Sequence, residues 1–429
     1  MRRCMPVAEP SLLSASRTEQ AATSGRWLSI VGIGEDGVAG LSATARELVS
    51  AAAFVFGGKR HLALAASLIT GSSRPWPSPF ADALPQIMAL RGEAVCVLAS
   101  GDPFMHGIGS VLGRHIPVAE MIVVPAPSAF SLAAARLCWS LPETVLLSLH
   151  GRPLDLIRPY LQPGARLLVL TSGSDAPAAL ANLLHTNGFG PSRMVILEAL
   201  GAAGERIRDA TADSFGLDGV APLNTVAITI AVGPGARVIP VAGGIDDALF
   251  EHDGQITKRE IRALSLSSLA PRRGERLWDI GAGSGSVAIE WMLADPSLQA
   301  IAVERRSDRA ARIRRNAAMF GVPHLSVIEG AAPAALGDLP TPDAAFIGGG
   351  ARAAGLIEAV CATIRPGGRL VVNAVTVATE ALLLAKQAEL GGDLTRIAIT
   401  RAGPVGSAAN GPLGWQPARP VTQWVWIKP

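Results

Sequence analysis

The chain has 429 residues, of which 49% are hydrophobic and 17% charged, so it can fill more than one buried core and is not a mainly disordered protein. Its formal net charge of +3 gives no general case for nucleic-acid binding. The four cysteines form no CxxC pair and are interpreted as reduced cytosolic thiols, the seven histidines show no spacing typical of a metal site, and no apolar run is long enough to span a bilayer.

The N-terminal half alternates between strand-like and helix-like segments. Residues 1–26 are polar and are interpreted as a mobile tail rather than a signal peptide, because no apolar segment follows the two arginines near the start. A first strand is predicted at 27–31, followed by a glycine-rich turn and a helix that reaches residue 53. Later strands are predicted, in chain order, at 94–99, 121–124, 145–149, 166–170, 193–197 and 225–231. This alternation indicates an α/β architecture with a largely parallel sheet.

The C-terminal half repeats the alternation after a change in composition. Residues 232–256 are rich in glycine and acidic side chains and are the best candidate for a linker, so domains are predicted at 27–235 and 236–429. Further strands are predicted at 276–280, 300–303, 326–329, 344–347, 369–373, 394–400 and 422–427. They indicate a second, doubly wound sheet.

A strand, a glycine turn and a helix follow one another at the start of this second sheet. The turn is Gly281-Ala282-Gly283-Ser284-Gly285 and comes directly after Asp279-Ile280. Glu304 ends the next strand, about 20 residues on, where an acid can bind both hydroxyls of a ribose. Asp279 disfavours a pyrophosphate and suits an ammonium group, so S-adenosylmethionine (SAM) is favoured over a dinucleotide. A tight turn without a ligand is the alternative.

The segment before this strand has two compatible interpretations. Thr257 and Glu260 have the spacing of a capping box, which predicts the start of a helix. The second interpretation is that the same helix start covers the cofactor, with Lys258, Arg259 and Arg262 facing an anionic substrate. A run of arginines between residues 305 and 315 is interpreted as the solvated face of a helix.

Four segments of the second domain, at 254–260, 277–285, 346–349 and 371–376, resemble the C15-methylating, decarboxylating methyltransferases of cobalamin biosynthesis. The resemblance covers about residues 240–429 and implies a Rossmann-like SAM-dependent domain. The implied cofactor contacts are Thr257, Gly281 to Gly285, Glu304 and Ala332. The chain departs from the family at Ala331, where an acid near the adenine is usual, and at Ala378, where the family often has Glu.

Three segments of the first domain, at 31–34, 99–109 and 125–132, resemble the tetrapyrrole methylase family. Residues 56–62 and 148–152 narrow the match to its C5-methylating branch, over about residues 27–235. The resemblance implies a bilobal fold that binds folded SAM between two α/β subdomains. The matching cofactor positions are Gly32, Gly34, Gly101, Asp102 and Ser128. The chain has Pro-Ala-Pro-Ser at 125–128, where Pro-Gly-x-Ser-Ser is usual.

Several residues of the first domain keep two interpretations. Asp102 by itself is typical of a turn-forming residue before proline, and with the family motifs it is a candidate catalytic residue. Lys59, Arg60 and His61 either clamp substrate carboxylates or form a surface turn. His150, the second catalytic candidate, either orients the substrate or is a buried structural histidine.

Together the two halves resemble the family that methylates precorrin-6Y at both C5 and C15. The resemblance implies loss of CO2 from the C12 acetate, consumption of two SAM per cycle and release of precorrin-8X, with no metal required. We expect a tetrapyrrole substrate and a cytoplasmic homo-oligomer, without a nucleic-acid or membrane partner, and leave open whether the ring already holds cobalt.

Two alternatives stay open. A nucleic-acid methyltransferase is disfavoured, because the chain lacks an Asn/Asp-Pro-Pro-Tyr motif and only 4% of its residues are aromatic, which leaves little for base stacking. A non-catalytic SAM-binding regulator is the other.

Overall fold

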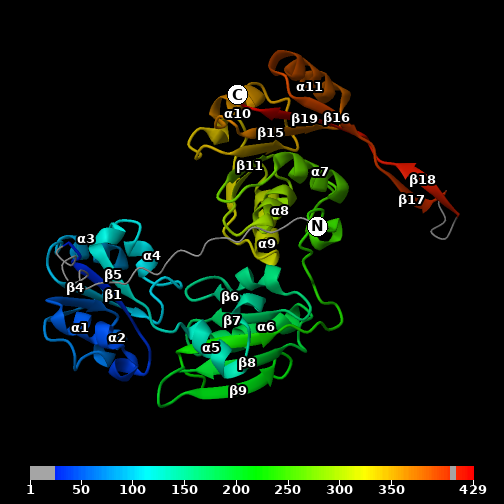
Figure 1. Ribbon diagram of the computed structural model, residues 1–429. Helices are drawn as coiled ribbons and strands as arrows, with labels where there is room; N and C mark the ends of the chain where they lie inside the picture. The colour runs from blue at the N-terminus through cyan, green and yellow to red at the C-terminus, as the bar shows by residue number, and fades with distance from the viewer. Residues whose placement is uncertain (1–24, 406–411) are drawn as a thin grey trace, which may run out of the picture.

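The computed structural model describes residues 25–405 and 412–429. Residues 1–24 of the predicted tail, which include Cys4, lie outside the described residues. The described chain forms two lobes, each with a five-stranded sheet, followed by a domain with a seven-stranded sheet and a separate two-stranded ribbon (Figure 1). None of the described helices is long and apolar enough to cross a bilayer.

The first lobe has an all-parallel sheet in the order β3-β2-β4-β1-β5. Alternate residues of β1 pack on opposite faces: Leu28 and Ile30 join one apolar cluster, and Val31 and Ile33 join another, as the twofold period of a strand requires. The strands are β1 (Leu28–Ile33), β2 (Phe54–Gly57), β3 (Ser72–Pro75), β4 (Val95–Ser100) and β5 (Met121–Val124), and the helices are α1 (Ala43–Ala51), α2 (Lys59–Leu64), α3 (Ala83–Met88) and α4 (Gly109–Leu112).

The second lobe has a mixed sheet in the order β6-β7-β10-β8-β9. Among neighbouring strands only β6 and β7 pair in parallel, so the prediction of a largely parallel sheet is wrong for this lobe. The short connection at 199–205 explains part of the difference, because a parallel crossover needs about a dozen residues or more. The strands are β6 (Thr144–Ser148), β7 (Arg166–Leu170), β8 (Arg193–Glu198), β9 (Arg206–Thr211) and β10 (Asn224–Thr229), and the helices are α5 (Ala129–Leu137) and α6 (Ala176–Thr186).

The C-terminal sheet has the order β13-β12-β11-β14-β15-β19-β16. Its strands run parallel except β19, which is antiparallel to both neighbours. The strands are β11 (Arg276–Ile280), β12 (Gln299–Glu304), β13 (Ser326–Glu329), β14 (Ala344–Ile347), β15 (Arg369–Ala374), β16 (Asp393–Ile397) and β19 (Val421–Ile427), and the helices are α7 (Arg259–Leu269), α8 (Ser286–Ala294), α9 (Ser307–Met319), α10 (Leu356–Thr363) and α11 (Val377–Leu390).

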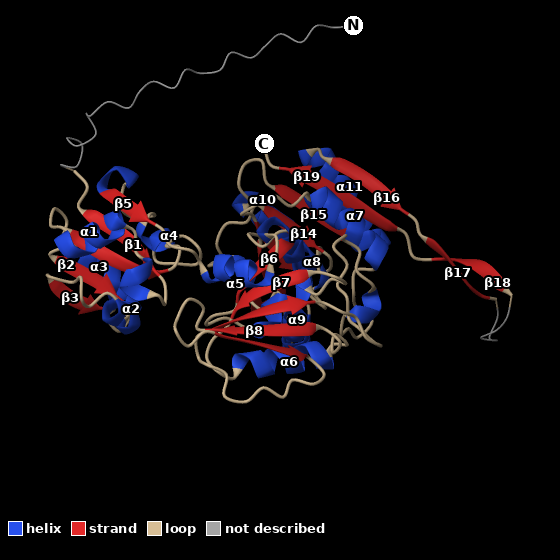
Figure 2. Ribbon diagram, turned by 60° about the horizontal axis from the view of Figure 1, so that its bottom comes forward, coloured by secondary structure: helices blue, strands red, loops and turns tan. Residues whose placement is uncertain are grey.

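Two further strands form a ribbon that projects from this sheet (Figure 2). The ribbon pairs β17 (Thr400–Pro404) with β18 (Leu413–Pro417) in antiparallel register. The strand predicted at 394–400 is therefore divided between β16 and β17. Short 3₁₀ helices lie at Gly37–Gly40, Phe80–Asp82, Val118–Glu120, Leu141–Glu143, Leu154–Tyr160, Asp247–Leu249 and Ala334–Leu336.

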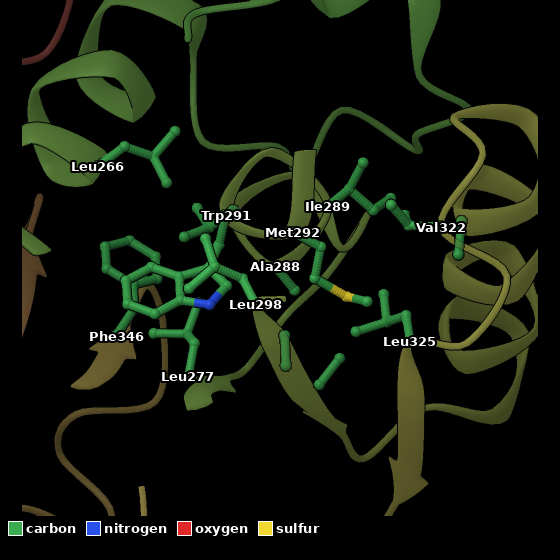
Figure 3. Packing of buried hydrophobic residues seen from close by; sticks show 14 of the residues in the cluster. Leu266, Leu277, Ala288, Ile289, Trp291, Met292, Leu298, Val322, Leu325 and Phe346 are labelled. Carbon is green, nitrogen blue, oxygen red and sulfur yellow. The ribbon is translucent and has the colours of Figure 1, made fainter. Parts of the chain in front are cut away.

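Apolar side chains fill both faces of the C-terminal sheet. On one face Trp291 of α8 lies with Leu277 and Phe346, which come from neighbouring strands (Figure 3). On the other face Trp278 and Trp424 belong to a second cluster. Full burial of a large apolar side chain contributes about 1.5–3 kcal/mol, so these clusters hold β11 and β14 rigidly where their carboxyl ends carry the glycine loops.

The chain passes from the N-terminal lobes to the C-terminal domain without a strand between β10 and β11. Val238 packs against the core of the second lobe, whereas Ile239 and Ile245 belong to the core of the C-terminal domain. The division predicted at 235/236 lies a few residues before this change of core. The two parts also touch elsewhere, since a Cβ atom on Gly321 would lie 2.4 Å from Cδ of Pro159.

Candidate functional site

A cavity of about 920 Å³ opens at the carboxyl ends of β11, β12 and β14. Ligands of open α/β sheets bind at this edge. Its wall combines the glycine turn after β11, the end of β12 and the glycines at 348–350 after β14. Residues 254–258, which precede α7, also line it.

The glycine turn after β11 is held between two other loops. Gly281 and Gly283 have φ angles of 70° and 59°, which L side chains rarely adopt. A Cβ atom on Gly281 would lie 2.8 Å from the carbonyl oxygen of Gly349, and one on Gly283 would lie 3.3 Å from that of Gln255. The turn therefore needs glycine both for its shape and for the close approach of its neighbours.

Only part of the predicted glycine motif faces the cavity. Gly281, Ala282 and Gly283 line it, as do Thr257, Asp279, Glu304 and Ala332. Ser284 is buried and Gly285 packs against α9, where a Cβ atom would lie 2.7 Å from Cγ2 of Ile313. Ser284 and Gly285 are therefore placed to shape the turn rather than to contact a ligand.

Glu304 is buried at the end of β12, with its carboxylate fixed from two sides. The backbone N–H of Gly283 donates to Oε2 at 2.9 Å, and that of Arg306 donates to Oε1 at 3.0 Å. A carboxylate has about four acceptor positions, so these two bonds leave capacity for hydroxyl donors in the cavity.

Asp279 lies beneath the turn with its side chain 1% exposed. Its Oδ2 accepts a hydrogen bond of 3.1 Å from the backbone N–H of Ala288 in α8. Burial raises the pKa of this carboxyl to about 7; the Ala288 hydrogen bond acts in the opposite direction, and the charge of Glu304 adds to the rise. Burial therefore shifts the Asp279 carboxyl toward its neutral form.

The capping box predicted at Thr257 and Glu260 does not form. Helix α7 begins at Arg259, and its N-cap is Lys258, which makes no side-chain cap hydrogen bond. Thr257 is thus one residue too early to cap, and the carboxylate of Glu260 pairs with Arg401. Thr257 instead belongs to the segment that lines the cavity.

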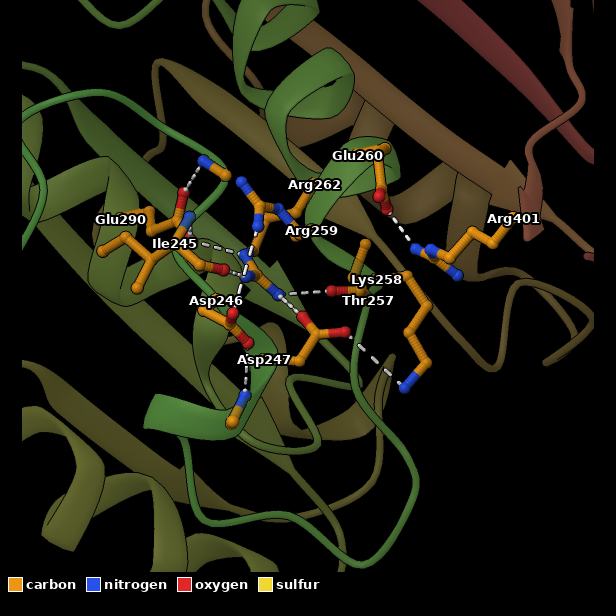
Figure 4. A network of polar contacts seen from close by, with 12 residues as sticks. Ile245, Asp246, Asp247, Thr257, Lys258, Arg259, Glu260, Arg262, Glu290 and Arg401 are labelled. Atoms are coloured by element: carbon orange, nitrogen blue, oxygen red, sulfur yellow. Dashed lines mark hydrogen bonds and ion pairs between the residues drawn. The ribbon is translucent and has the colours of Figure 1, made fainter. Parts of the chain in front are cut away.

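Arg262 is fully buried at the centre of a polar network (Figure 4). Its Nε donates to Oε1 of Glu290 at 2.5 Å, and its Nη1 lies 3.0 Å from Oδ1 of Asp247. The guanidinium also donates to the carbonyl oxygens of Thr257 and Ile245. A buried and fully paired guanidinium cannot reach a ligand, so Arg262 holds the 254–258 segment in place and does not bind the substrate as the sequence suggested.

The two cations beside Arg262 in the sequence are placed differently from each other. Lys258 lines the cavity and its Nζ lies 3.6 Å from Oδ2 of Asp247. Arg259 is not part of the lining and lies 4.0 Å from Oδ2 of Asp246. Of the three predicted substrate cations of this domain, only Lys258 faces the cavity.

The loops of the first lobe converge at the carboxyl ends of β1, β4 and β5. A Cβ atom on Gly32 would lie 1.9 Å from the carbonyl oxygen of Gly101 and 2.6 Å from the backbone nitrogen of Ala126. Gly34 is looser, since its nearest neighbour is the side chain of Asp36. The predicted glycines therefore belong to one cluster of loops.

The predicted polar residues of this cluster also shape the backbone. Oδ1 of Asp102 accepts a hydrogen bond of 2.8 Å from the N–H of Phe104, which is the local turn that its position before proline predicts. Ser128 caps α5 by accepting a hydrogen bond of 3.1 Å from the N–H of Ser131. One carboxylate oxygen of Asp102 remains without a hydrogen bond from the described residues.

The basic cluster at 59–61 begins α2 and is therefore not a surface turn. Arg60 pairs with Glu35 in the loop after β1, while Lys59 is exposed. Burial, with a further contribution from the charge of Arg60, lowers the pKa of His61 to about 4, so its ring is neutral at pH 7. Lys59 is the residue of the three best placed to meet an anion.

His150 lies after β6 in the second lobe and is exposed, so the buried structural interpretation is wrong. Its Nδ1 lies 3.2 Å from both the carbonyl oxygen of Thr171 and Oγ of Ser172.

Several lining residues had no signal in the sequence reasoning. Ile399, Arg401, Arg419 and Val421 come from the chain around the ribbon, whereas Asn373 belongs to β15. The segment at 371–376 was noted for its resemblance, but the residues after 397 carry no motif. Only the antiparallel return of β19 beside β15 brings them to the cavity.

Comparison with known proteins connects both halves to one activity. A family model described as Tetrapyrrole (Corrin/Porphyrin) Methylases matches residues 28–216, and one described as Precorrin methyltransferase domain matches residues 248–428. A precorrin-6Y C(5,15)-methyltransferase [decarboxylating] of Sinorhizobium sp is 58% identical, over 97% of this chain and 100% of its own length. The protein of that name from Mycobacterium tuberculosis is 42% identical, over 92% and 98%. The solved C-terminal domain of precorrin-6Y C5,15-methyltransferase from Rhodobacter capsulatus is 46% identical and covers 44% of this chain and 100% of its own, with a TM-score of 0.41.

Proposed function

Because this chain belongs to the family of precorrin-6Y C(5,15)-methyltransferases (decarboxylating), we propose that it methylates precorrin-6Y at C5 and C15 from two separate donor sites and removes CO2 from the C12 acetate to give precorrin-8X. Membership makes the protein a SAM-dependent methyltransferase of cobalamin biosynthesis. The observation that carries the two-site proposal is that each domain has a glycine-built cluster of loops at the carboxyl ends of parallel strands.

The C-terminal cavity suits SAM in both its size and its polar groups. When bound, SAM supplies an electrophilic methyl group, and the protein has to align that group with a ring carbon and exclude water. We assign Glu304 to the ribose hydroxyls of the donor. The backbone of Gly281–Gly283 is assigned the close approach to the donor, and Ala332 forms the far wall of the cavity. Thr257 covers the site, and Asp279 supports the turn from below with a carboxyl that also suits the ammonium group.

In the N-terminal domain we assign the donor to the loops that meet at Gly32, Gly101 and Ser128. Their close backbone packing forms a rigid floor. The second carboxylate oxygen of Asp102 is available to a ligand at this floor, and Lys59 is available to a substrate carboxylate.

We assign C5 methylation to residues 27–235, and C15 methylation with decarboxylation to residues 236–429. In the methyl transfers the ring carbon forms a bond to the methyl group as the bond from that group to sulfur breaks. In the decarboxylation a C–C bond breaks and CO2 leaves. The electron pair is delocalised into the conjugated macrocycle, and the side-chain carbon takes up a proton to become a methyl group. The described residues then have to position the ring and hold its acid side chains.

The C-terminal assignment is tested with Glu304→Gln and its neighbour variant Glu329→Gln, in the full-length protein. Glu329 lies beside Glu304 on β13 but is exposed and outside the cavity. With precorrin-6Y and ¹³C-methyl SAM, we expect E304Q to lose C15 labelling and CO2 release and E329Q to keep both. Equal C15 labelling in E304Q and wild type would remove Glu304 from the site.

The N-terminal assignment is tested with Asp102→Asn against Asp82→Asn, an exposed residue of the same lobe. Asparagine can still accept the Phe104 hydrogen bond, so the turn is kept while the charge is lost. We expect D102N to lose C5 labelling. A wild-type protein that binds SAM but leaves the pigment unchanged would instead support the non-catalytic regulator.

Stoichiometry and assembly need separate measurements. Titration calorimetry with S-adenosylhomocysteine is expected to count two sites per chain in wild type and one in E304Q. Sedimentation is expected to find a homo-oligomer, and cell fractionation to find the protein in the cytoplasm.

A further inference from the structure

The C-terminal cavity has a cationic rim, in which most cations already have an acidic partner. Five cationic side chains line it: Lys258, Arg305, Arg309, Arg401 and Arg419. Lys258 lies 3.6 Å from Asp247, Arg309 lies 2.9 Å from Asp253, and Arg401 pairs with Glu260. Arg305 and Arg419 make no ion pair with any of the residues described, and both are exposed.

These two arginines stand at the same edge of the sheet but on opposite sides of the cavity. Arg305 directly follows β12, and Arg419 precedes β19, whose Thr422 pairs with Ala374 at the carboxyl end of β15. Four strand-to-strand steps separate β12 from β19 in the sheet. At about 4.8 Å per step, the two positions are roughly 19 Å apart along the sheet. That separation exceeds what one small anion can bridge.

We propose that Arg305 and Arg419 bind carboxylate side chains of the tetrapyrrole from opposite sides of the C-terminal cavity and so orient the ring over the donor site. The inference rests on the proposed function, and it replaces the solvated-helix interpretation of Arg305. A tetrapyrrole carries acid side chains that point outward around its ring, so two cations on facing walls can engage two of them at once.

The chemistry of the two positions favours this role. An exposed arginine costs little to leave in water, whereas it gains a two-pronged, charge-assisted bond when a carboxylate arrives. Glu304 and Asp279 line the inner wall, so a polyanionic ring meets repulsion if it enters too far and attraction at the rim. The outer cations and inner acids together favour the anionic substrate outside and the cationic sulfonium inside.

The test compares Arg305→Gln and Arg419→Gln with matched arginines outside the cavity. Arg306→Gln is the control for the first, since Arg306 is adjacent but pairs with Asp308. Arg396→Gln is the control for the second, since Arg396 is exposed on β16 and lies 3.5 Å from Glu380. Each full-length variant is assayed for C15 methyl incorporation across a range of precorrin-6Y concentrations and salt concentrations.

We expect each cavity variant to lower kcat/KM for C15 methylation by about 10-fold or more, mainly through KM, and each control to stay within about twofold. The dependence of KM on salt is expected to weaken in R305Q and R419Q, because each removes one charge pair that salt screens. Arg305→Lys and Arg419→Lys keep the charge and are expected to recover part of the loss.

Two results would overturn the inference. One is an unchanged KM and salt dependence in both cavity variants. The other is a loss of S-adenosylhomocysteine affinity that accounts for the whole change in kcat/KM, which would place the arginines on the donor. Failure of the proposed function is distinguishable, because the wild-type protein itself would then yield no C15-methylated, decarboxylated product.

Discussion

The two glycine-built sites of this protein lie at the same position on their sheets. The site of the first lobe is formed by main-chain atoms, whereas the C-terminal site takes its polar groups from side chains. At Gly32 the nearest neighbours are backbone atoms of two other loops, so the site of the first lobe is a close junction of main chains. At Gly281–Gly283 the turn borders an open cavity whose chemistry comes from side chains, chiefly Glu304 and Asp279. The same edge of a sheet can therefore either present backbone groups to a ligand or surround the ligand with charged side chains.

The largest effect is expected from Gly32→Ala. An added Cβ would lie 1.9 Å from the carbonyl oxygen of Gly101, a clash with backbone that no rotamer relieves. We expect C5 methylation to fall by at least about 1000-fold, on the order of 4 kcal/mol, while C15 methylation continues. Positional ¹³C labelling measures both.

Gly34→Ala is the matched control for that junction. Its added Cβ meets only the side chain of Asp36, which can move. We expect near-wild-type C5 labelling in G34A. An equal loss of C5 labelling in G32A and G34A would contradict the prediction that only the added Cβ at position 32 disrupts the site.

Arg262→Met is expected to affect stability more than binding. It leaves the buried Glu290 without its ion-pair partner, and breaking such a pair costs about 3–5 kcal/mol. Chemical denaturation, followed through the unfolding transition of the C-terminal domain, measures this free energy of unfolding. Arg259→Met is the control, because Arg259 is exposed and lies 4.0 Å from Oδ2 of Asp246. Its free energy of unfolding is expected to stay within about 0.5 kcal/mol of the wild-type value.

Asp279 predicts a pH dependence in the ligand-free protein. Its pKa is about 7 when folded, against a usual value of 3.8, so the unfolded chain gives up this proton first. The stability of the C-terminal domain should therefore fall as the pH rises from about 4 and level off above about 7. Asp279→Asn should flatten that part of the profile, and an unchanged slope in denaturation between pH 5 and 8 would contradict it.

The smallest effect is expected at Lys59. It is the exposed cation of its cluster, whereas Arg60 is paired with Glu35. We expect Lys59→Gln to raise KM for C5 methylation by about threefold, the effect expected when one exposed charge that contacts the substrate is lost. Arg114→Gln is the control, because Arg114 is an exposed residue of the same lobe, and it is expected to leave KM unchanged.

Sequence patterns predicted the parts of the fold that depend on neighbouring residues. The strands at 121–124, 166–170, 276–280, 326–329 and 344–347 were placed at their observed bounds, because each contains a short apolar run that is bordered by polar or turn-forming residues. The strand β9 was missed, since the exposed sequence Arg-Ile-Arg-Asp-Ala-Thr has no core-facing alternation. Strand direction in the second lobe was also missed, because antiparallel pairing of β10 depends on partners far along the chain.

Motif and spacing alone determined that a glycine turn, Asp279 and Glu304 meet at one sheet edge, because a strand, a tight turn and a helix are local structures. Tertiary packing decided which cations reach that edge. Arg262 is buried in the core because it pairs with Glu290, 28 positions away. Arg419 lines the cavity because it precedes β19, which pairs antiparallel with β15. The physical reason is that the environment of a long charged side chain is set by the segments that pack around it, and those are distant in sequence.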